Sequence, residues 1–307
     1  MRGVNRCAAR RHHSHHVSRR EFVVASSASL LSASLVGLLP NRLAAAAEIA
    51  QHGPASKYVP VIKACFVRRK GEYGMRWPGQ VFDGEAARQK YTNQIREEAK
   101  TLGIKIDLLE TPIYSMEEAQ QWIAKAVESK ADGLLVVLLD RQEHAWPAAT
   151  AAVDSGIPTV IFSPIGSAFT SNTVSLAGRT GCLICSTDDF DQVRWGIKML
   201  KAGAKMRQTR CLVIKGNERA DTEMTGLGIK LRTIPAGQFL EEYNATPVDD
   251  RVKAMAADLI KHAEKQEGAT EDDVLNGIKS YLVAARLMER EECDAITMDC
   301  LGALGKS

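Results

Sequence analysis

From about residue 58 onward, short and almost wholly apolar runs alternate with longer segments in which apolar residues recur every three or four positions. Such runs are typical of parallel strands buried on both faces, and such segments are typical of helices that pack one side against a sheet. In the first half of the chain the runs lie at 59–67, 104–109, 133–139 and 157–162, and the helical segments at 84–102, 115–127 and 146–154. This half predicts a small doubly wound sheet.

The same alternation restarts near residue 181. Strand-like runs lie at 181–185, 211–214, 229–234 and 295–298, and helical segments at 190–206, 249–264 and 270–290. We therefore predict an α/β protein of two consecutive Rossmann-like domains with doubly wound parallel sheets, residues 48–170 and 171–307. They are joined around residues 163–180, which are rich in Ser, Thr and Gly. The repetition is one of architecture, without a visible residue-level repeat.

Two of the predicted helices carry a start signal. Ser115 is followed three residues later by Glu118, and Thr270 by Asp273, which is the spacing of a capping box. The apolar positions predict which side of each helix is buried: Trp122, Ile123, Ala126 and Val127 in the first, and Val274, Ile278, Leu282 and Ala285 in the second.

The first 47 residues have the layout of an export signal. An arginine-rich start is followed by the apolar run 23–39 and by Ala44–Ala47, small residues of the kind that signal peptidases accept. The run is too short and too rich in Ser and Ala for a stable membrane span after signal removal. Arg19 and Arg20, followed by Phe22, resemble the twin-arginine signal of bacteria, which implies export to the periplasm. If the signal is not used, the protein stays in the cytoplasm.

Charge is distributed unevenly along the chain, whose total is +3. Residues 1–47 hold seven arginines against the single acid Glu21, a net +6, which leaves a net −3 for the rest. With 45% hydrophobic and 25% charged residues, the composition is that of a globular protein. The body has no basic character of the kind that binds nucleic acid.

Polar residues that directly follow predicted strands are the candidates for binding a ligand, because ligands of open parallel sheets lie beyond the carboxyl ends of the strands. In the first domain these are Arg76 and Trp77 in the loop 68–79 after the first strand, Asp140 and Arg141 after the third, and Ser163 after the fourth. Trp77 would stack on a sugar face and Arg76 would donate to hydroxyls. In the second domain Lys215 and Asn217 follow one strand, and Asp299 follows the last.

Six cysteines remain when Cys7 is removed with the signal. Cys182 and Cys185 form a CxxC pair, but the residues between them are strand-like, whereas a redox pair stands at a helix start. Most of the six lie in apolar strands, which suits a chain that folds in the reducing cytoplasm before export. We therefore predict buried thiols. Phosphate-binding and dinucleotide-binding glycine motifs are absent, as is the G-x-S-x-G motif of serine hydrolases.

Two consecutive Rossmann-like domains that end in "AITMDCL" resemble the N-terminal and central domains of the L-fucose/L-arabinose isomerase family. The stretches "KGNERAD" and "GIKSYLVAARLMEREECDAITMDCL" are similar to exported relatives of that family, and the resemblance covers residues 58–304. It implies a manganese-dependent aldose–ketose isomerisation of a monosaccharide, with Asp299 as both a catalytic residue and the first metal ligand. It also leaves a homo-oligomer open.

The same resemblance implies that the metal site is incomplete. The family's second acid and its histidine ligand lie further along the chain than Ser307, and none of His52, His144 or His262 matches the histidine. We therefore expect a truncated central domain, a fragment without useful Mn²⁺ binding or turnover.

Two alternatives remain open at this stage. The first is an exported sugar-binding protein of a transporter, which shares the signal, the two α/β domains and the candidate residues. Such proteins usually cross between their domains two or three times, whereas the order of elements here predicts one crossing. The second is a regulatory or scaffolding domain without a small ligand.

Overall fold

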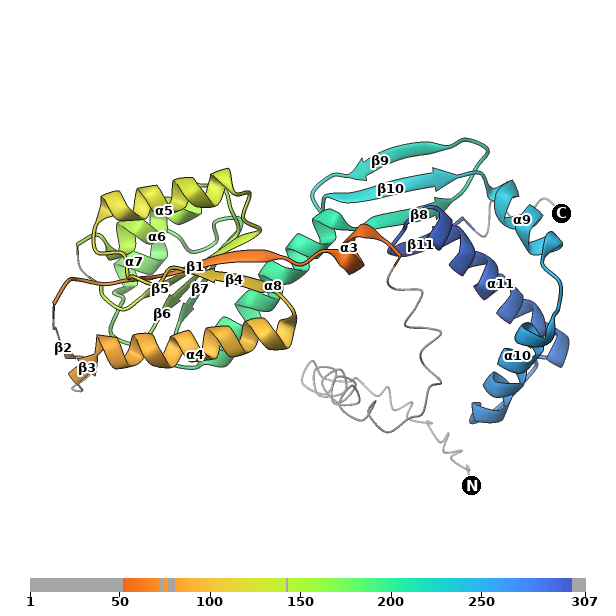
Figure 1. Ribbon diagram of the computed structural model, residues 1–307, viewed down its shortest axis with the longest axis horizontal. Helices are drawn as coiled ribbons and strands as arrows, with labels where there is room; N and C mark the ends of the chain where they lie inside the picture. Colours follow the sequence, from red (N-terminus) through yellow and green to blue (C-terminus); the bar gives the residue numbers. More distant parts are fainter. Residues whose placement is uncertain (1–51, 72–73, 77–80, 142, 300–307) are drawn as a thin grey trace, which may run out of the picture. The chain divides into compact units, whose positions relative to one another are not determined.

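The computed structural model describes residues 52–71, 74–76, 81–141 and 143–299. The predicted signal, residues 1–47, and Trp77 lie outside the described residues. The α/β fold class is confirmed, since the structure contains a five-stranded parallel sheet and a second, four-stranded sheet, each with helices packed against it (Figure 1).

The first sheet has the strand order β4–β1–β5–β6–β7, and neighbouring strands in it pair parallel. Its strands are β1 (Val61–Val67), β4 (Lys105–Leu108), β5 (Gly133–Leu138), β6 (Thr159–Ser163) and β7 (Cys182–Ser186). The central strands β5 and β6 are buried at every position, as the unbroken apolar runs predict.

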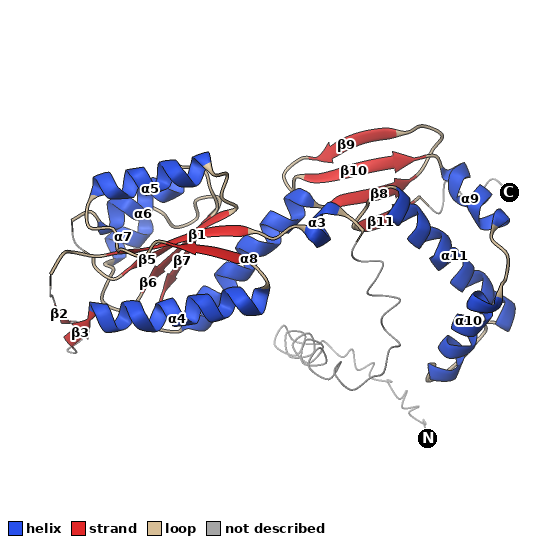
Figure 2. Ribbon diagram, viewed as in Figure 1, coloured by secondary structure: helices blue, strands red, loops and turns tan. Residues whose placement is uncertain are grey.

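Helices cover both faces of this sheet (Figure 2). On one face, α4 (Gly84–Leu102) and α8 (Phe190–Gln208) pack on a core that includes Phe66 and Phe162. On the other, α5 (Met116–Glu128) and α6 (Ala145–Asp154) pack on Val136 and Ile161. Smaller elements are α3 (Pro54–Lys57), α7 (Thr170–Val174) and the hairpin of β2 (Gly74–Arg76) and β3 (Val81–Asp83).

The second sheet has the order β11–β8–β10–β9. Its strands are β8 (Arg210–Ile214), β9 (Ala220–Met224), β10 (Ile229–Ile234) and β11 (Ala295–Met298), and the helices that follow β10 are α9 (Ala236–Ala245), α10 (Asp250–His262) and α11 (Glu271–Arg290). Leu212, Ile214 and Ile234 form one core with Phe239 of α9 and Leu287 of α11.

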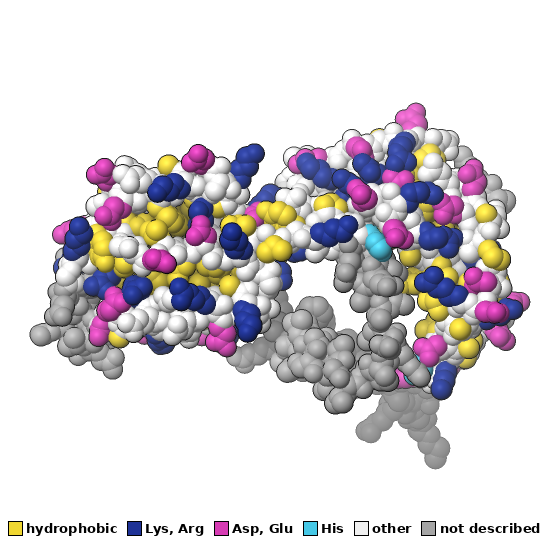
Figure 3. Space-filling view, in the orientation of Figure 1, with side chains coloured by type: hydrophobic (Ala, Val, Ile, Leu, Met, Phe, Trp, Pro, Cys, Tyr) yellow, Lys and Arg dark blue, Asp and Glu magenta, His cyan; other side chains and the backbone are white. Residues whose placement is uncertain are grey.

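Two expectations about the sheets are corrected. The run at 181–185 does not open the second sheet, because β7 pairs with β6 in register Phe162↔Cys185 and completes the first. The second sheet is mixed rather than parallel, because β9 runs antiparallel to β10. The sequence did not predict β9, because all five of its residues are exposed and it contains no apolar run. Its Asp221 and Glu223 pair with Arg232 and Lys230 of β10, where basic and acidic side chains gather (Figure 3).

The predicted helix starts are confirmed. Ser115 accepts a hydrogen bond from the Glu118 backbone amide at 3.2 Å, and Thr270 and Asp273 form a reciprocal capping box. Val127, expected on the buried side of α5, is instead exposed. None of the helices within the described ranges is long and apolar enough to cross a membrane.

The same turn leads into a strand of each sheet. After α5, Lys130 adopts a positive φ of 51°, and Asp132 accepts a hydrogen bond from the Val61 amide at 2.8 Å, at the start of β1. After α11, Glu292 adopts the same φ of 51°. Asp294 then accepts from the Arg210 amide at 3.0 Å, at the start of β8. The two turns share their backbone conformation and the position of the aspartate, but only the aspartates are identical, so the repetition stays one of local structure.

The two aspartates also hold the segments that join the sheets. The backbone amides of Ala55 and Ser56 donate to the Asp294 carboxylate at 3.1 and 2.9 Å. The Tyr58 hydroxyl donates to Asp132 at 2.7 Å, and Arg207 at the end of α8 donates to the Asp132 carbonyl at 3.2 Å. All strands of the first sheet precede Arg207 and all strands of the second follow it, so the chain passes from one sheet to the other once, as the order of elements predicts. The passage follows α8, however, rather than lying at residues 163–180.

Candidate functional site

The carboxyl edge of the first sheet contains a buried carboxylate, Asp140, which follows β5. Only 1% of Asp140 is exposed. Its Oδ2 lies 2.6 Å from Nε of Arg69, which follows β1, and its Oδ1 accepts a hydrogen bond from the Arg141 amide at 2.7 Å. β1 and β5 are neighbouring parallel strands, so the residues that follow them are neighbours at this edge. The ion pair compensates the burial of the Asp140 carboxylate and holds it in one orientation.

Arg141 extends the site toward an exposed aromatic ring. Its guanidinium carbon lies 4.5 Å from the centroid of the Phe169 ring, and its Nη1 donates to the Gly166 carbonyl at 3.4 Å. Phe169 is 54% exposed. A guanidinium over an aromatic face is a favourable contact and fixes the orientation of both groups.

Two serine hydroxyl groups at the end of β6 and in the loop that follows it form hydrogen bonds within the protein. Ser163 and Ser167 are buried, and their Oγ atoms lie 2.7 Å apart. Ser167 also accepts from the Trp146 indole through its backbone carbonyl at 2.9 Å. These bonds hold residues 163–167 against α6, and so support the loop that carries Phe169.

His144, at the start of α6, has an unsatisfied atom. Its side chain is 9% exposed. Among the residues that the structure describes, Nε2 has no hydrogen-bond partner, and Nδ1 lies 3.9 Å from the Glu143 carboxylate. A buried polar atom without a hydrogen-bond partner is unusual in a folded protein.

Three aromatic side chains pack together in the core near this edge of the sheet. Tyr91 of α4 packs edge-on against Phe162, with ring centroids 4.7 Å apart, and lies parallel to Phe190 at 6.2 Å. Burial, and to a smaller extent the charge of Asp188, raises the pKa of Tyr91 to about 12. The phenol therefore stays protonated at neutral pH and contributes to the core rather than to acid–base chemistry.

The predicted site residues divide between the two sheets. Asp140 lies at the first sheet's edge, whereas Lys215, Asn217 and Asp299 are exposed at the carboxyl ends of β8 and β11. The Asp299 amide donates to the Ile214 carbonyl at 3.0 Å, which places Asp299 beside Lys215. Arg76 ends β2, and the position of its side chain lies outside what the structure describes.

Sequence reasoning placed Arg141 beside Asp140 and placed Arg69 in the loop after the first strand, but it did not single out Arg69, and it missed Phe169. Arg69 and Arg141 each stand within two residues of a predicted strand end, in agreement with the rule that selected Asp140. Phe169 lies in the stretch that was interpreted as an interdomain linker, and no local signal marks it.

A metal site at Asp299 finds no support in the described part of the chain. Within these ranges, no group of three or more His, Cys, Asp or Glu residues could hold a metal ion. Asp299 is exposed and hydrogen-bonded through its backbone to β8. The assignment of Asp299 as a catalytic metal ligand stays a prediction of the isomerase resemblance.

No family model matches the sequence, and no curated protein matches it. Among solved structures, the chain is similar to a sugar ABC transporter from Yersinia enterocolitica subsp. enterocolitica, at 13% identity and a TM-score of 0.29. That match covers 78% of this chain and 65% of the other, so the chain spans about two thirds of the length of that protein. It is also similar to an ABC transporter solute-binding protein from Burkholderia multivorans with an unknown ligand, at 14% identity and a TM-score of 0.27. The second match covers 77% of this chain and 78% of the other.

No comparison supports the isomerase interpretation, since no family model or curated protein matches and the two solved structures above are proteins of ABC transport. TM-scores below 0.3 do not establish a shared fold, so a functional proposal has to rest on the geometry of the site.

Proposed function

We propose that the protein is an exported carbohydrate-binding protein that holds a monosaccharide at the carboxyl edge of the first sheet. The observation that carries the proposal is the buried Asp140 carboxylate, held by Arg69 beside the Arg141–Phe169 pair. The edge is where open parallel sheets bind ligands, and the group of residues there combines charge, hydrogen bonding and an exposed aromatic face.

Each group has a use in recognising a sugar. A carboxylate accepts hydrogen bonds from hydroxyl groups, and guanidinium groups donate to hydroxyl oxygens. The Phe169 ring offers an apolar face for the C–H side of a pyranose or furanose. Because the Arg69–Asp140 ion pair already orders the carboxylate, binding costs little loss of side-chain freedom there.

Export belongs to the same proposal. The basic and then apolar layout of residues 1–47 is that of a signal, and a binding protein that collects sugars for transport works outside the cytoplasm. The charge of the remaining chain, a net −3, gives no reason to expect an anionic ligand.

The test is calorimetric titration of the protein with a panel of aldoses and ketoses. We expect Asp140→Asn to weaken the binding of the preferred sugar at least about tenfold, which corresponds to about 1.4 kcal/mol. The matched control is Asp154→Asn, at the end of α6, which also removes a carboxylate that pairs with an arginine, Arg179, but lies outside the site.

A second variant separates binding from folding, because Asp140 is buried. Phe169→Ala truncates an exposed ring, and we expect it to weaken binding several-fold without a change in the unfolding midpoint. Val174→Ala is its control, since Val174 is also an exposed apolar side chain. The proposal is wrong if no sugar of the panel binds at millimolar concentration, or if Asp140→Asn and Phe169→Ala bind as the unaltered protein does.

A further inference from the structure

Strand β7 is an edge strand of the first sheet. It pairs with β6, and no other described strand pairs with it. Its residues, Cys182 to Ser186, include no charge and no proline, which are the features that natural proteins use to protect an exposed strand edge. Leu183 and Ile184 are only half-buried. The edge therefore offers both unpaired backbone groups and apolar side chains.

Helix α8, which packs against this edge, exposes two large apolar side chains. Trp195 is 56% exposed and Met199, one turn later, is 48% exposed. They lie on the same side of the helix because residues four apart are neighbours on a helix surface. A tryptophan and a methionine together on the surface are typical of interfaces between proteins.

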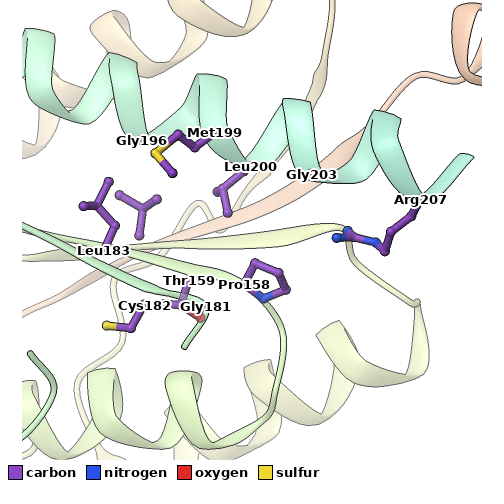
Figure 4. A pocket seen from close by; sticks show the side chains of 11 residues that line it. Pro158, Thr159, Gly181, Cys182, Leu183, Gly196, Met199, Leu200, Gly203 and Arg207 are labelled. Carbon is purple, nitrogen blue, oxygen red and sulfur yellow. The ribbon is translucent and has the colours of Figure 1, made fainter. Parts of the chain in front are cut away.

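An apolar slot lies between α8 and the ends of β6 and β7 (Figure 4). Its volume is about 190 Å³, and its walls include Pro158, Leu183, Met199 and Leu200. A Cβ atom built on Gly203 would meet only Nη1 of Arg207, at 3.6 Å, so the slot is open at this glycine. The slot is large enough for the side chain of a methionine or leucine.

Charged side chains flank β7 at both ends. Arg179 precedes the strand and pairs with Asp154 at 2.6 Å, and Arg207, which lines the slot at the same end, lies 3.8 Å from Asp132. Asp188 and Asp189, both exposed, follow the strand at the other end. Antiparallel pairing of two such strands brings these arginines of each copy toward Asp188 and Asp189 of the other.

We propose that this surface binds a second copy of the chain, so that two β7 strands pair antiparallel about a twofold axis and join the two first sheets. The surface is complementary to itself because it carries both protruding apolar side chains and a slot that receives such side chains. The same pairing places the arginines at one end of β7 near the aspartates of the other copy. A twofold contact requires this kind of self-complementarity.

The test is sedimentation equilibrium of the full chain over a range of concentrations. We expect a particle of twice the chain mass of 33.5 kDa. Met199→Lys should weaken the association at least about tenfold, and the matched control Leu259→Lys, on an equally exposed residue of α10, should leave it unchanged. Because both positions are exposed on helices, neither change is expected to prevent folding.

A pair of glycine variants tests the slot itself. Gly203→Leu fills it and should weaken association, whereas Gly237→Leu, at a helical glycine of α9 with open space around it, should not. A chain that is monomeric at about 100 µM, or a dimer that Met199→Lys and Gly203→Leu leave intact, overturns the proposal. Sugar binding is measured separately and does not enter this result.

Discussion

At the scale of single residues, the cysteine thiols show how burial raises a pKa. The five described cysteines are all free, and Cys65, Cys185 and Cys293 are buried. Burial raises the pKa of Cys185 and Cys293 to about 11, and it also raises the pKa of the half-buried Cys182. The Cys182–Cys185 pair lies in β7 rather than at a helix start, so its thiols stay protonated at neutral pH. The prediction of buried thiols is confirmed for Cys65, Cys185 and Cys293, whereas Cys182 and Cys211 are only half-buried. The absence of redox chemistry stays a prediction.

We predict that the free energy of unfolding falls as pH rises from about 9 to about 11. Cys185 and Cys293 have a pKa of about 11 in the folded protein and an ordinary value of 9.0, so the unfolded chain releases their protons first. Their contribution is complete below pH 9 and is lost as pH rises through the folded value. Urea titrations at pH 8, 9 and 10 measure it.

The control for this prediction is Cys293→Ala. Tyrosines and lysines also titrate in this pH range, and the variant leaves them in place. Its free energy of unfolding should fall less steeply with pH than that of the unaltered chain. Equal slopes for the two proteins would show that Cys293 contributes nothing to the pH dependence.

At the scale of elements, helix α8 shows how closely sequence spacing and packing agree. Its apolar positions Val193, Ile197 and Leu200 recur at helical spacing and lie in the core of the first sheet. Gly196, on the same side, allows the helix to approach the sheet, because a Cβ there would lie 3.0 Å from Cγ1 of Val160 and 3.1 Å from Cδ2 of Leu183. A glycine that weakens the helix is retained at the point of closest contact.

We predict opposite effects for two glycine-to-alanine changes in helices. Gly196→Ala should lower the free energy of unfolding by ~1–2 kcal/mol, because overpacking outweighs the gain in helix propensity. Gly277→Ala, in α11, should raise it by ~0.5–1 kcal/mol, because a Cβ there meets nothing within 4 Å. Chemical denaturation of both variants measures the difference, and changes of the same sign in both would contradict the packing argument.

At the scale of the whole molecule, one carboxylate joins segments that are far apart in the sequence. Asp294 accepts hydrogen bonds from the amides of Ala55, Ser56 and Arg210, and so connects the segment before β1 to the start of β8. Gly53 lies so close that a Cβ on it would be 2.2 Å from Cγ of Asp294. The Lys205 ammonium group donates to the Ala55 carbonyl from the other side.

We predict that Asp294→Ala lowers the free energy of unfolding by ~2–4 kcal/mol, because three backbone donors lose a charged acceptor. The same change should speed tryptic cleavage after Lys57, since residues 54–57 lose their attachment to the second sheet. Glu128→Ala, which removes an exposed carboxylate at the end of α5, is the control. Cleavage at Lys57 that is no faster in Asp294→Ala than in the control would contradict this role.

The pattern of apolar positions was sufficient for most helices and buried strands. The bounds of α4 and β11 agree with the sequence prediction, because helical spacing and unbroken apolar runs record directly which sides of an element are buried. The same pattern missed β9, whose side chains are all exposed, and α9, since neither carries a strong apolar signal. It also predicted Asp140 as a site residue, from its position after a buried strand.

What the pattern could not supply is which distant segments meet. A short apolar strand such as β7 can pair with either sheet, because backbone hydrogen bonds are the same for every sequence. The packing of Cys182 and Ile184 against one layer and Cys185 against the other places it beside β6. Likewise Arg69 reaches Asp140 across 71 positions of sequence only because β1 and β5 are neighbours. The sequence determines the helices and strands because it records which side of each element is kept from water. The candidate site depends on contacts between distant residues, which form only when the strands assemble into a sheet.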